Sequence, residues 1–434
     1  MNDTECEVLV VGAGPAGSAA ALRAAHAGRD VLLVDMQDFP RDKTCGDGLT
    51  PRAVHALDRL GASDLVATTA GRPEIRGLRL HGFGGSVTAP WPDHPEFPAR
   101  GTAVARSDLD NALVERAVAA GARLVTGSKA VDVETDLVRG AHRVRAVVLA
   151  DGSRVRCRYL VLAEGVRSVL ARTLGVQWLR GLVHGVAARS YCPSPFGDEP
   201  WIHSHLELRD SDGVAQPGYG WIFPLGTTGG HGSAVNLGCG TLSTSRRPAK
   251  VNVRRLLSSY AGQCRDGWQL GEPTLVASAL LPMGGAVTRV AGVNWAAVGD
   301  TAALVNPLNG EGIDYALESG ADVVDLLPDA DRSPDGLRHL WPDHLRGRYG
   351  DAFSLARRAA TLLTRPGLLS ALGPLGMRGP LAEPLMGTAT RLMGNLVTPE
   401  DRDLTARAWL AAGRLSGAHD RFWHAESRPL FGAS

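Results

Sequence analysis

The sequence predicts an α/β fold in which a Rossmann-like nucleotide domain is joined to an antiparallel β-sheet domain and a helical C-terminal tail. An apolar run, a glycine-rich turn and an alanine-rich segment follow one another near the N-terminus. Residues 181–290 alternate polar and apolar side chains between many glycines, as antiparallel strands do. From about Leu340 the spacing is helical. Four prolines are expected to interrupt these helices: Pro366, Pro374, Pro380 and Pro384.

Length and composition indicate a globular enzyme of two intertwined domains. The 434 residues exceed one ordinary hydrophobic core. The formal net charge is +1 and no basic run occurs, so no nucleic-acid partner is expected. The six cysteines form no C-x-x-C pair, which argues against a zinc site and fits a reducing compartment. The N-terminus does not resemble a signal peptide, and no uncharged stretch is long enough to span a bilayer. We therefore expect a cytoplasmic protein without a metal.

The first elements form a complete β-α-β unit. A buried strand is predicted over residues 7–11, and a turn with the spacing G-x-G-x-x-G occupies residues 12–17. A helix over about residues 18–27 and a second strand over residues 31–34 follow, and this strand ends at Asp35. A glycine-rich turn in another kind of α/β protein is the alternative, but the strand, helix, second strand and terminal acid agree in favouring a dinucleotide site.

Each glycine of this turn has a physical role in such a site. Gly12 allows the tight turn out of the strand, Gly14 lets a pyrophosphate approach the backbone, and Gly17 lets the helix pack closely on the strand. The helix N-terminus presents free N–H groups to the phosphates. The carboxylate at the end of the second strand accepts from ribose hydroxyls. The residues expected to contact the nucleotide here are Gly12, Gly14, Pro15, Ala16, Gly17 and Asp35.

The elements between this unit and the tail are predicted from periodicity and turn residues. Helices are expected over residues 52–60 and 107–120 and from near Gly312. Strands are expected within residues 76–100 and over residues 123–125, 144–149, 159–163 and 296–298.

Three later segments indicate that the nucleotide is FAD. Arg106, at a helix start, can pair with the pyrophosphate or the ribityl chain, although a solvated helix-end arginine is the alternative. Asp300 follows a buried strand and can accept from ribityl hydroxyls, or cap the next helix. The turn over residues 306–313 opens a helix, so its free N–H groups can face the negative charge of a reduced flavin. A plain loop-to-helix turn is improbable for four segments in this order.

These segments together resemble the para-hydroxybenzoate hydroxylase-type flavoprotein superfamily, and within it the geranylgeranyl reductase family, over nearly the whole chain. Residues 39–49, with the sequence FPRDKTCGDGL, are similar to the family's loop beside the flavin. Residues 219–224, YGWIFP, match its Y-x-W-x-F-P substrate motif, and residues 236–238 resemble the glycine segment that follows. The glycine-rich stretch between Pro224 and Asn236 is longer than the family pattern, a departure that concerns the shape of the pocket and not the cofactor.

The resemblance implies an FAD-binding domain of the glutathione reductase type, assembled from residues 1–75, 101–180 and 276–340. Residues 76–100 and 181–275 would form the substrate domain, and residues 341–434 a helical C-terminal region. It further implies cofactor contacts from Arg41, Cys45, Gly46, Ala130, Gly310, Gly312 and Ile313.

Family members reduce carbon–carbon double bonds of isoprenoid chains, such as geranylgeranyl lipids or the side chain of menaquinone. Relatives in bacterial secondary metabolism are monooxygenases that hydroxylate aromatic or terpenoid substrates, and this alternative stays open. Only one dinucleotide fingerprint is present, so NAD(P)H would bind transiently at the flavin, or an external carrier would deliver electrons.

The chemistry requires an apolar pocket and a proton donor. Tyr219, Trp221 and Phe223 lie on one strand face and suit the pocket, unless they are only domain core. Cys45 is a candidate donor or steering group, although a free cysteine is usually a small buried apolar residue. Asp47 is a second candidate if burial raises its pKa.

The tail suggests a lipid-like substrate at a membrane surface. Residues 362–393 combine leucine and arginine with little acid, as an interfacial helix does. The alternative is that these leucines only pack the tail onto the other domains. The leucines concerned are Leu362, Leu363, Leu368, Leu369, Leu372, Leu375, Leu385 and Leu392. Peripheral contact with the inner face of the membrane is therefore an expectation.

Overall fold

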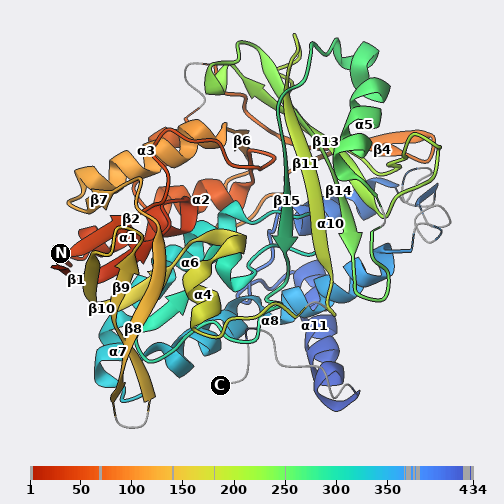
Figure 1. The fold of residues 1–434 in the computed structure, drawn as a ribbon. Helices are drawn as coiled ribbons and strands as arrows, with labels where there is room; N and C mark the ends of the chain where they lie inside the picture. Colours follow the sequence, from red (N-terminus) through yellow and green to blue (C-terminus); the bar gives the residue numbers. More distant parts are fainter. Residues whose placement is uncertain are drawn as a thin grey trace.

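Two β-sheets lie side by side in the computed structural model, and helices of the C-terminal region pack along them (Figure 1). The structure describes residues 3–67, 71–138, 141–179, 181–249, 251–365 and 382–423, together with positions 367, 373, 374, 377 and 431. The long helix α8 (Leu337–Leu363) contacts a strand of each sheet, so it bridges the two halves of the molecule.

The first sheet carries the predicted β-α-β unit. Its strand order is β7 (Arg123–Val125), β2 (Val31–Val34), β1 (Asp3–Val11), β10 (Arg154–Leu162), β9 (Ala141–Leu149) and β8 (Ala130–Val138), and β16 (Trp295–Ala297) pairs with the end of β10. Strands β7, β2, β1, β10 and β16 are parallel. Helices cover the central strands, so Val8, Leu9 and Val10 are fully buried, as the apolar run predicted.

Helix α1 (Pro15–His26) packs closely against this sheet because its residues are small. A Cβ at Gly17 would overlap the carbonyl oxygen of Gly12, so only glycine allows the approach. On its other side α1 contacts α3 (Arg106–Ala119) and α6 (Ile313–Asp325). The start of α1 therefore lies close to elements drawn from three distant parts of the sequence.

The second sheet contains the strands of residues 77–90 and 184–282. Its order is β15 (Thr274–Pro282), β11 (His184–Pro193), β14 (Ala234–Ser243), β13 (Gly218–Gly226), β12 (Trp201–His205), β4 (Gly77–Gly82) and β5 (Gly85–Pro90). All its neighbours are antiparallel except β12 and β4, which run parallel. The prediction of strands throughout residues 181–290 is wrong for α5 (Val253–Trp268), an amphipathic helix that buries Leu257 and Tyr260 against this sheet.

The described residues include further α-helices besides α1, α3, α5, α6 and α8. They are α2 (Pro51–Arg59), α4 (Val169–Thr173), α7 (Leu327–Arg332), α10 (Ala382–Met393) and α11 (Leu404–Trp423). The short strands β3 (Gly48–Leu49) and β6 (Thr102–Ala103) pair with each other. Pro384 does not interrupt a helix but lies in the first turn of α10, where proline removes no helical bond. Within the described ranges, no helix is long and apolar enough to cross a membrane.

Candidate functional site

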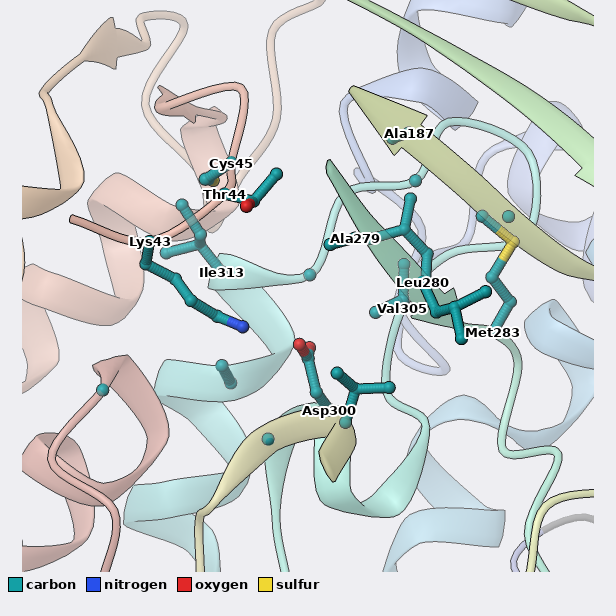
Figure 2. Close-up of a pocket in the computed structure, with 18 of the residues that line it drawn as sticks. Lys43, Thr44, Cys45, Ala187, Ala279, Leu280, Met283, Asp300, Val305 and Ile313 are labelled. Carbon is teal, nitrogen blue, oxygen red and sulfur yellow. The ribbon is translucent and has the colours of Figure 1, made fainter. Parts of the chain in front are cut away.

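A cavity of about 1450 Å³ lies between the two sheets. One end is lined by the glycine turn after β1 and the other by apolar side chains of β11, β13 and β15. Figure 2 shows Lys43 and Asp300 pointing toward each other across the polar part of the cavity, while Ala279, Leu280 and Met283 lie on its apolar side. The cavity therefore combines a polar half suited to a nucleotide with a half suited to an apolar substrate.

Most predicted cofactor residues converge on this cavity, although they come from distant segments. Those that line it are Gly12, Gly14, Pro15, Ala16, Asp35, Arg41, Cys45, Gly46, Arg106, Ala130, Asp300, Gly310, Gly312 and Ile313. Gly17 lies outside the lining, beneath the turn, where it allows α1 to approach β1.

The turn at Gly14 fits a pyrophosphate. A Cβ at this position would lie 3.8 Å from a terminal guanidinium nitrogen of Arg41 and of Arg106. Arg106 is held by two 2.7 Å hydrogen bonds to Asp110, which also accepts from Arg41 at 3.2 Å. The buried Nε of Arg41 has no hydrogen-bond partner among the described residues. Two fixed cations and a helix N-terminus thus surround a position without a side chain, an arrangement that attracts phosphate oxygens.

The two aspartates differ in what holds them. Asp35 is buried, and its carboxylate accepts from the backbone N–H of Ala13 at 2.7 Å and of Gln37 at 2.9 Å. It therefore shapes the glycine turn in addition to lining the cavity. Asp300 does not cap the short turn Gly299–Ala302 in which it lies. Its carboxylate points into the cavity, which leaves it available to hydroxyl donors (Figure 2).

The turn before α6 differs from the expectation in one respect. Oε1 of Glu311 accepts from the backbone N–H of Gly312 at 3.3 Å and of Ile313 at 3.2 Å. Two N–H groups that the glycine pattern assigned to the flavin are thus engaged by the chain itself. Burial, reinforced by the negative charge of Asp314, raises the pKa of Glu311 to about 8. Only the acidic residue directly before the helix start signalled this contact in the sequence.

The aromatic strand face lies as the alternation predicted. Tyr219, Trp221 and Phe223 of β13 line the cavity. Ile222 faces the other way, where it is fully buried in the cluster beneath α5. The ring of Trp221 occupies the space above Gly238 that a Cβ would need. This contact explains the glycine in the segment after the aromatic motif.

The loop after β2 closes over this aromatic face. A Cβ at Gly46 would lie 2.8 Å from the ring of Phe223, so the loop packs directly on it. Asn236 of β14 donates to the carbonyl of Cys45 at 2.7 Å and accepts from the indole N–H of Trp221 at 3.0 Å. Burial raises the pKa of the Cys45 thiol to about 12, so the thiol is protonated at neutral pH and is a weak acid.

Asp47 does not reach the cavity. Its side chain is fully buried behind the loop, where it accepts from Asn236 at 2.8 Å. Burial raises the pKa of Asp47 to about 6, as expected for a carboxyl group in an apolar environment. Its position nevertheless separates it from any molecule in the cavity, so direct proton donation lacks support.

The tail contributes to the apolar end of the cavity. Leu363 of α8 and Ala389, Leu392 and Met393 of α10 line it. These residues therefore pack the tail onto the rest of the protein, which was the alternative to a membrane-facing helix. They do so around the cavity. Leu368, Leu369, Leu372, Leu375 and Arg378 lie outside the described residues. Sequence spacing marked the tail as apolar and helical but gave no signal for its contact with the cavity.

Comparisons with known proteins agree with this geometry. The family model of the FAD binding domain matches residues 5–230. Menaquinone reductase of Mycobacterium tuberculosis is 53% identical over 420 residues, which cover 96% of this chain and 98% of that protein. Digeranylgeranylglycerophospholipid reductase 1 of Methanopyrus kandleri is 29% identical, over 83% of this chain and 91% of that protein. The crystal structure of a geranylgeranyl bacteriochlorophyll reductase-like protein from Thermoplasma acidophilum has a TM-score of 0.70 at 22% identity, covering 86% of this chain and 91% of that one.

Proposed function

The chain belongs to the FAD-binding domain family as an FAD-dependent oxidoreductase of the geranylgeranyl reductase type, and we propose that it reduces a carbon–carbon double bond in the isoprenoid side chain of a menaquinone-like lipid. The observation that carries this proposal is the apolar end of the cavity. There Leu281, Met283, Leu363, Leu392 and Met393 continue the aromatic face of β13. A long hydrocarbon chain fits such a lining, because an isolated double bond offers no polar group to hold.

When FAD is bound and reduced, it supplies a hydride to the double bond. The chain's own residues hold the reactants in place. Arg41 and Arg106 would bind the pyrophosphate, Asp300 would accept from the ribityl hydroxyls, and Trp221, held by Asn236, would form a rigid wall for the substrate. A hydrocarbon chain packed against the apolar walls would exclude water from the reacting carbons while it is bound.

Several finer assignments belong to the same proposal. The glutathione reductase type of the nucleotide domain is supported by the parallel order β7, β2, β1, β10 and β16. The electron donor is NAD(P)H bound transiently at the flavin, or an external carrier, since only one glycine fingerprint is present. The scattered cysteines, which form no C-x-x-C pair, support a cytoplasmic location as part of the same proposal.

Single-turnover reduction tests the reaction. Anaerobically reduced holoenzyme mixed with a menaquinone that has an unsaturated side chain is expected to yield a product heavier by two hydrogen atoms, with reoxidation of the flavin. A menaquinone whose side chain is fully saturated is the control and is expected to give no side-chain product. Oxygen-dependent flavin reoxidation with gain of one oxygen atom in the product would instead establish the monooxygenase alternative and overturn the proposal.

Peripheral membrane contact is a further part of the proposal, supported by exposed leucines on the helices that border the cavity. Leu362 of α8 is 50% exposed and Leu385 of α10 is 48% exposed. Full burial of a leucine side chain in an interface contributes about 1.5–3 kcal/mol, and about half of that for each of these half-exposed leucines. Replacing both residues by Asp is therefore expected to reduce flotation with anionic vesicles by at least about tenfold.

Two leucines of α11 provide the matched control for flotation. Leu404 and Leu415 are 85% and 75% exposed, and no described residue of α11 lines the cavity. Their replacement by Asp is expected to leave flotation unchanged if the contact surface borders the cavity. Wild-type protein that stays in solution at low salt, or equal losses in both double variants, would contradict the membrane contact.

A further inference from the structure

We propose that Glu311 is the acid that protonates the substrate carbon opposite the one that receives hydride. The inference rests on the proposed double-bond reduction and names a residue for its second half. Hydride transfer to one carbon of the double bond leaves the electron pair of the broken π bond on the other carbon, and that carbon takes up a proton, so that C=C becomes CH–CH. Glu311 supplies H⁺, becomes a carboxylate, and regains its proton from water before the next turnover.

The position of Glu311 supports this role. The residue lies in the turn between Asn306 and α6 and lines the cavity. On the cavity wall it is near Cys45 of the loop after β2, Arg106 of α3 and Tyr219 of β13, which all line the same cavity. The phenolic O–H of Tyr219 donates to the carbonyl of Asn309 in this turn, which fixes the turn against the aromatic strand.

The carboxyl group is arranged to lose a proton and to hold the resulting charge. Oε1 accepts from the backbone N–H groups of Gly312 and Ile313, and no described residue bonds to Oε2. Oε2 is thus the oxygen that can carry a proton into the cavity. After transfer, the same two N–H groups and the positive end of the α6 dipole stabilise the carboxylate.

The charges around Glu311 keep it protonated at neutral pH. Burial and the carboxylate of Asp314 on α6 favour the neutral form, while the two N–H groups and Arg106 favour the ionised form. The balance raises the pKa to about 8. The group is therefore an acid below about pH 8 and loses this capacity as the pH rises through that value. Cys45 and Tyr219, which also face it, are neutral at this pH because burial raises the pKa of both.

The other carboxyl groups on the cavity wall have different roles. Asp35 accepts two backbone N–H groups of the glycine turn. Glu164 accepts from the hydroxyl of Ser168 and from the N–H of Val169, at the start of α4. Asp300 points into the polar half toward Lys43 (Figure 2). Among the described cavity carboxyls, Glu311 is thus the one that faces the aromatic strand.

The test compares wild type with Glu311→Gln in single-turnover formation of the product with a reduced side chain, from the reduced holoenzyme and the unsaturated menaquinone. Loss of a general acid is expected to slow this step by about 10²-fold or more. The substrate concentration that gives half of the maximal single-turnover rate is expected to change by less than about threefold. The wild-type rate is expected to fall as the pH rises through about 8, and the variant is expected to show no such limb. Glu272→Gln, an exposed substitution on the second domain, is the control and is expected to behave as wild type.

Infrared spectroscopy supplies a readout that does not depend on turnover. Wild-type holoenzyme at pH 7 is expected to show the C=O stretch of a protonated carboxyl group that Glu311→Gln lacks. Glu311→Asp, which keeps an acid in the turn, is expected to retain the pH limb at a reduced rate, even if the Gln variant fails to hold FAD. An unchanged rate and pH profile in Glu311→Gln, or an unchanged carboxyl band, would overturn the inference. Failure of wild type to reduce the substrate at all would overturn the proposed function instead.

Discussion

Gly14→Val is expected to abolish FAD binding while leaving the fold intact. The valine side chain would project toward the guanidinium groups of Arg41 and Arg106, where a Cβ already comes within 3.8 Å of both. It would take the place of the pyrophosphate. Two charge-assisted hydrogen bonds contribute about 1.5–3 kcal/mol each, so affinity is expected to fall by about 10²- to 10⁴-fold.

The backbone at Gly14 makes this substitution a clean test of the cofactor site. Its φ of −76° and ψ of −172° are extended and open to any residue, so valine introduces no backbone strain there. The measurement is FAD affinity by titration of the apoprotein, with circular dichroism to verify folding. Gly262→Val is the control, because a Cβ at Gly262 on α5 meets no atom within 4 Å. A Gly14→Val protein that retains FAD with wild-type affinity would contradict the placement of the pyrophosphate.

The nucleotide half of the site could be predicted from sequence because its signals are local. The strand, the glycine spacing, the alanine-rich helix and Asp35 lie within one continuous stretch, and each follows from the geometry of a tight turn. The alternation of β13 likewise placed Tyr219 and Trp221 on one face without knowledge of the partner strands. In both cases residues close together in the sequence determine the local backbone geometry, and that geometry determines where the side chains point.

The rest of the site depends on contacts between distant segments, which no local pattern encodes. Asp47 is two residues from Cys45, yet the loop turns it away from the cavity at a φ of +65°. Glu311 looked like one residue of a glycine-rich turn, and its environment arises from burial and from Asp314. Helix α5 was not predicted, because it lies in the sequence between strands of the second sheet. Its apolar residues are buried against that sheet, a contact between distant segments.

Arg52 forms a buried ion pair that sequence reasoning missed. This α2 residue is 2% exposed and forms two 2.8 Å hydrogen bonds to Glu318 of α6. It also donates to the carbonyl of Asn395, after α10, at 2.9 Å. Asn395 in turn accepts from Asn306 at 2.7 Å in the turn before α6. The ion pair therefore joins the C-terminal region to the turn that borders the flavin site.

Arg52→Met is expected to destabilise the protein by about 3–5 kcal/mol, because the buried carboxylate of Glu318 loses both 2.8 Å hydrogen bonds to Arg52 and keeps the Tyr349 hydroxyl and the longer 3.4 Å pair with Arg348. The measurement is the change in free energy of unfolding from urea titrations followed by circular dichroism. Arg52→Met combined with Glu318→Met removes both charges and is expected to recover most of the loss. A single variant within about 1 kcal/mol of wild type would contradict the importance of the pair.

The pH dependence of this effect follows from Glu318. Although burial alone raises its pKa, the charge of Arg52 and its hydrogen bonds outweigh burial and hold the pKa of Glu318 at about 2, below its ordinary value of 4.5. A depressed pKa contributes stability that is present above pH 4.5 and is lost as the pH falls toward 2. In Arg52→Met this contribution is reduced, because burial still raises the pKa of Glu318 while Arg348 and the Tyr349 hydroxyl remain to lower it. The difference in stability between wild type and Arg52→Met is therefore expected to be largest near neutral pH and to shrink as the pH is lowered. A difference that stays constant down to acidic pH would show that the loss arises from packing of the Arg52 side chain and not from its charge.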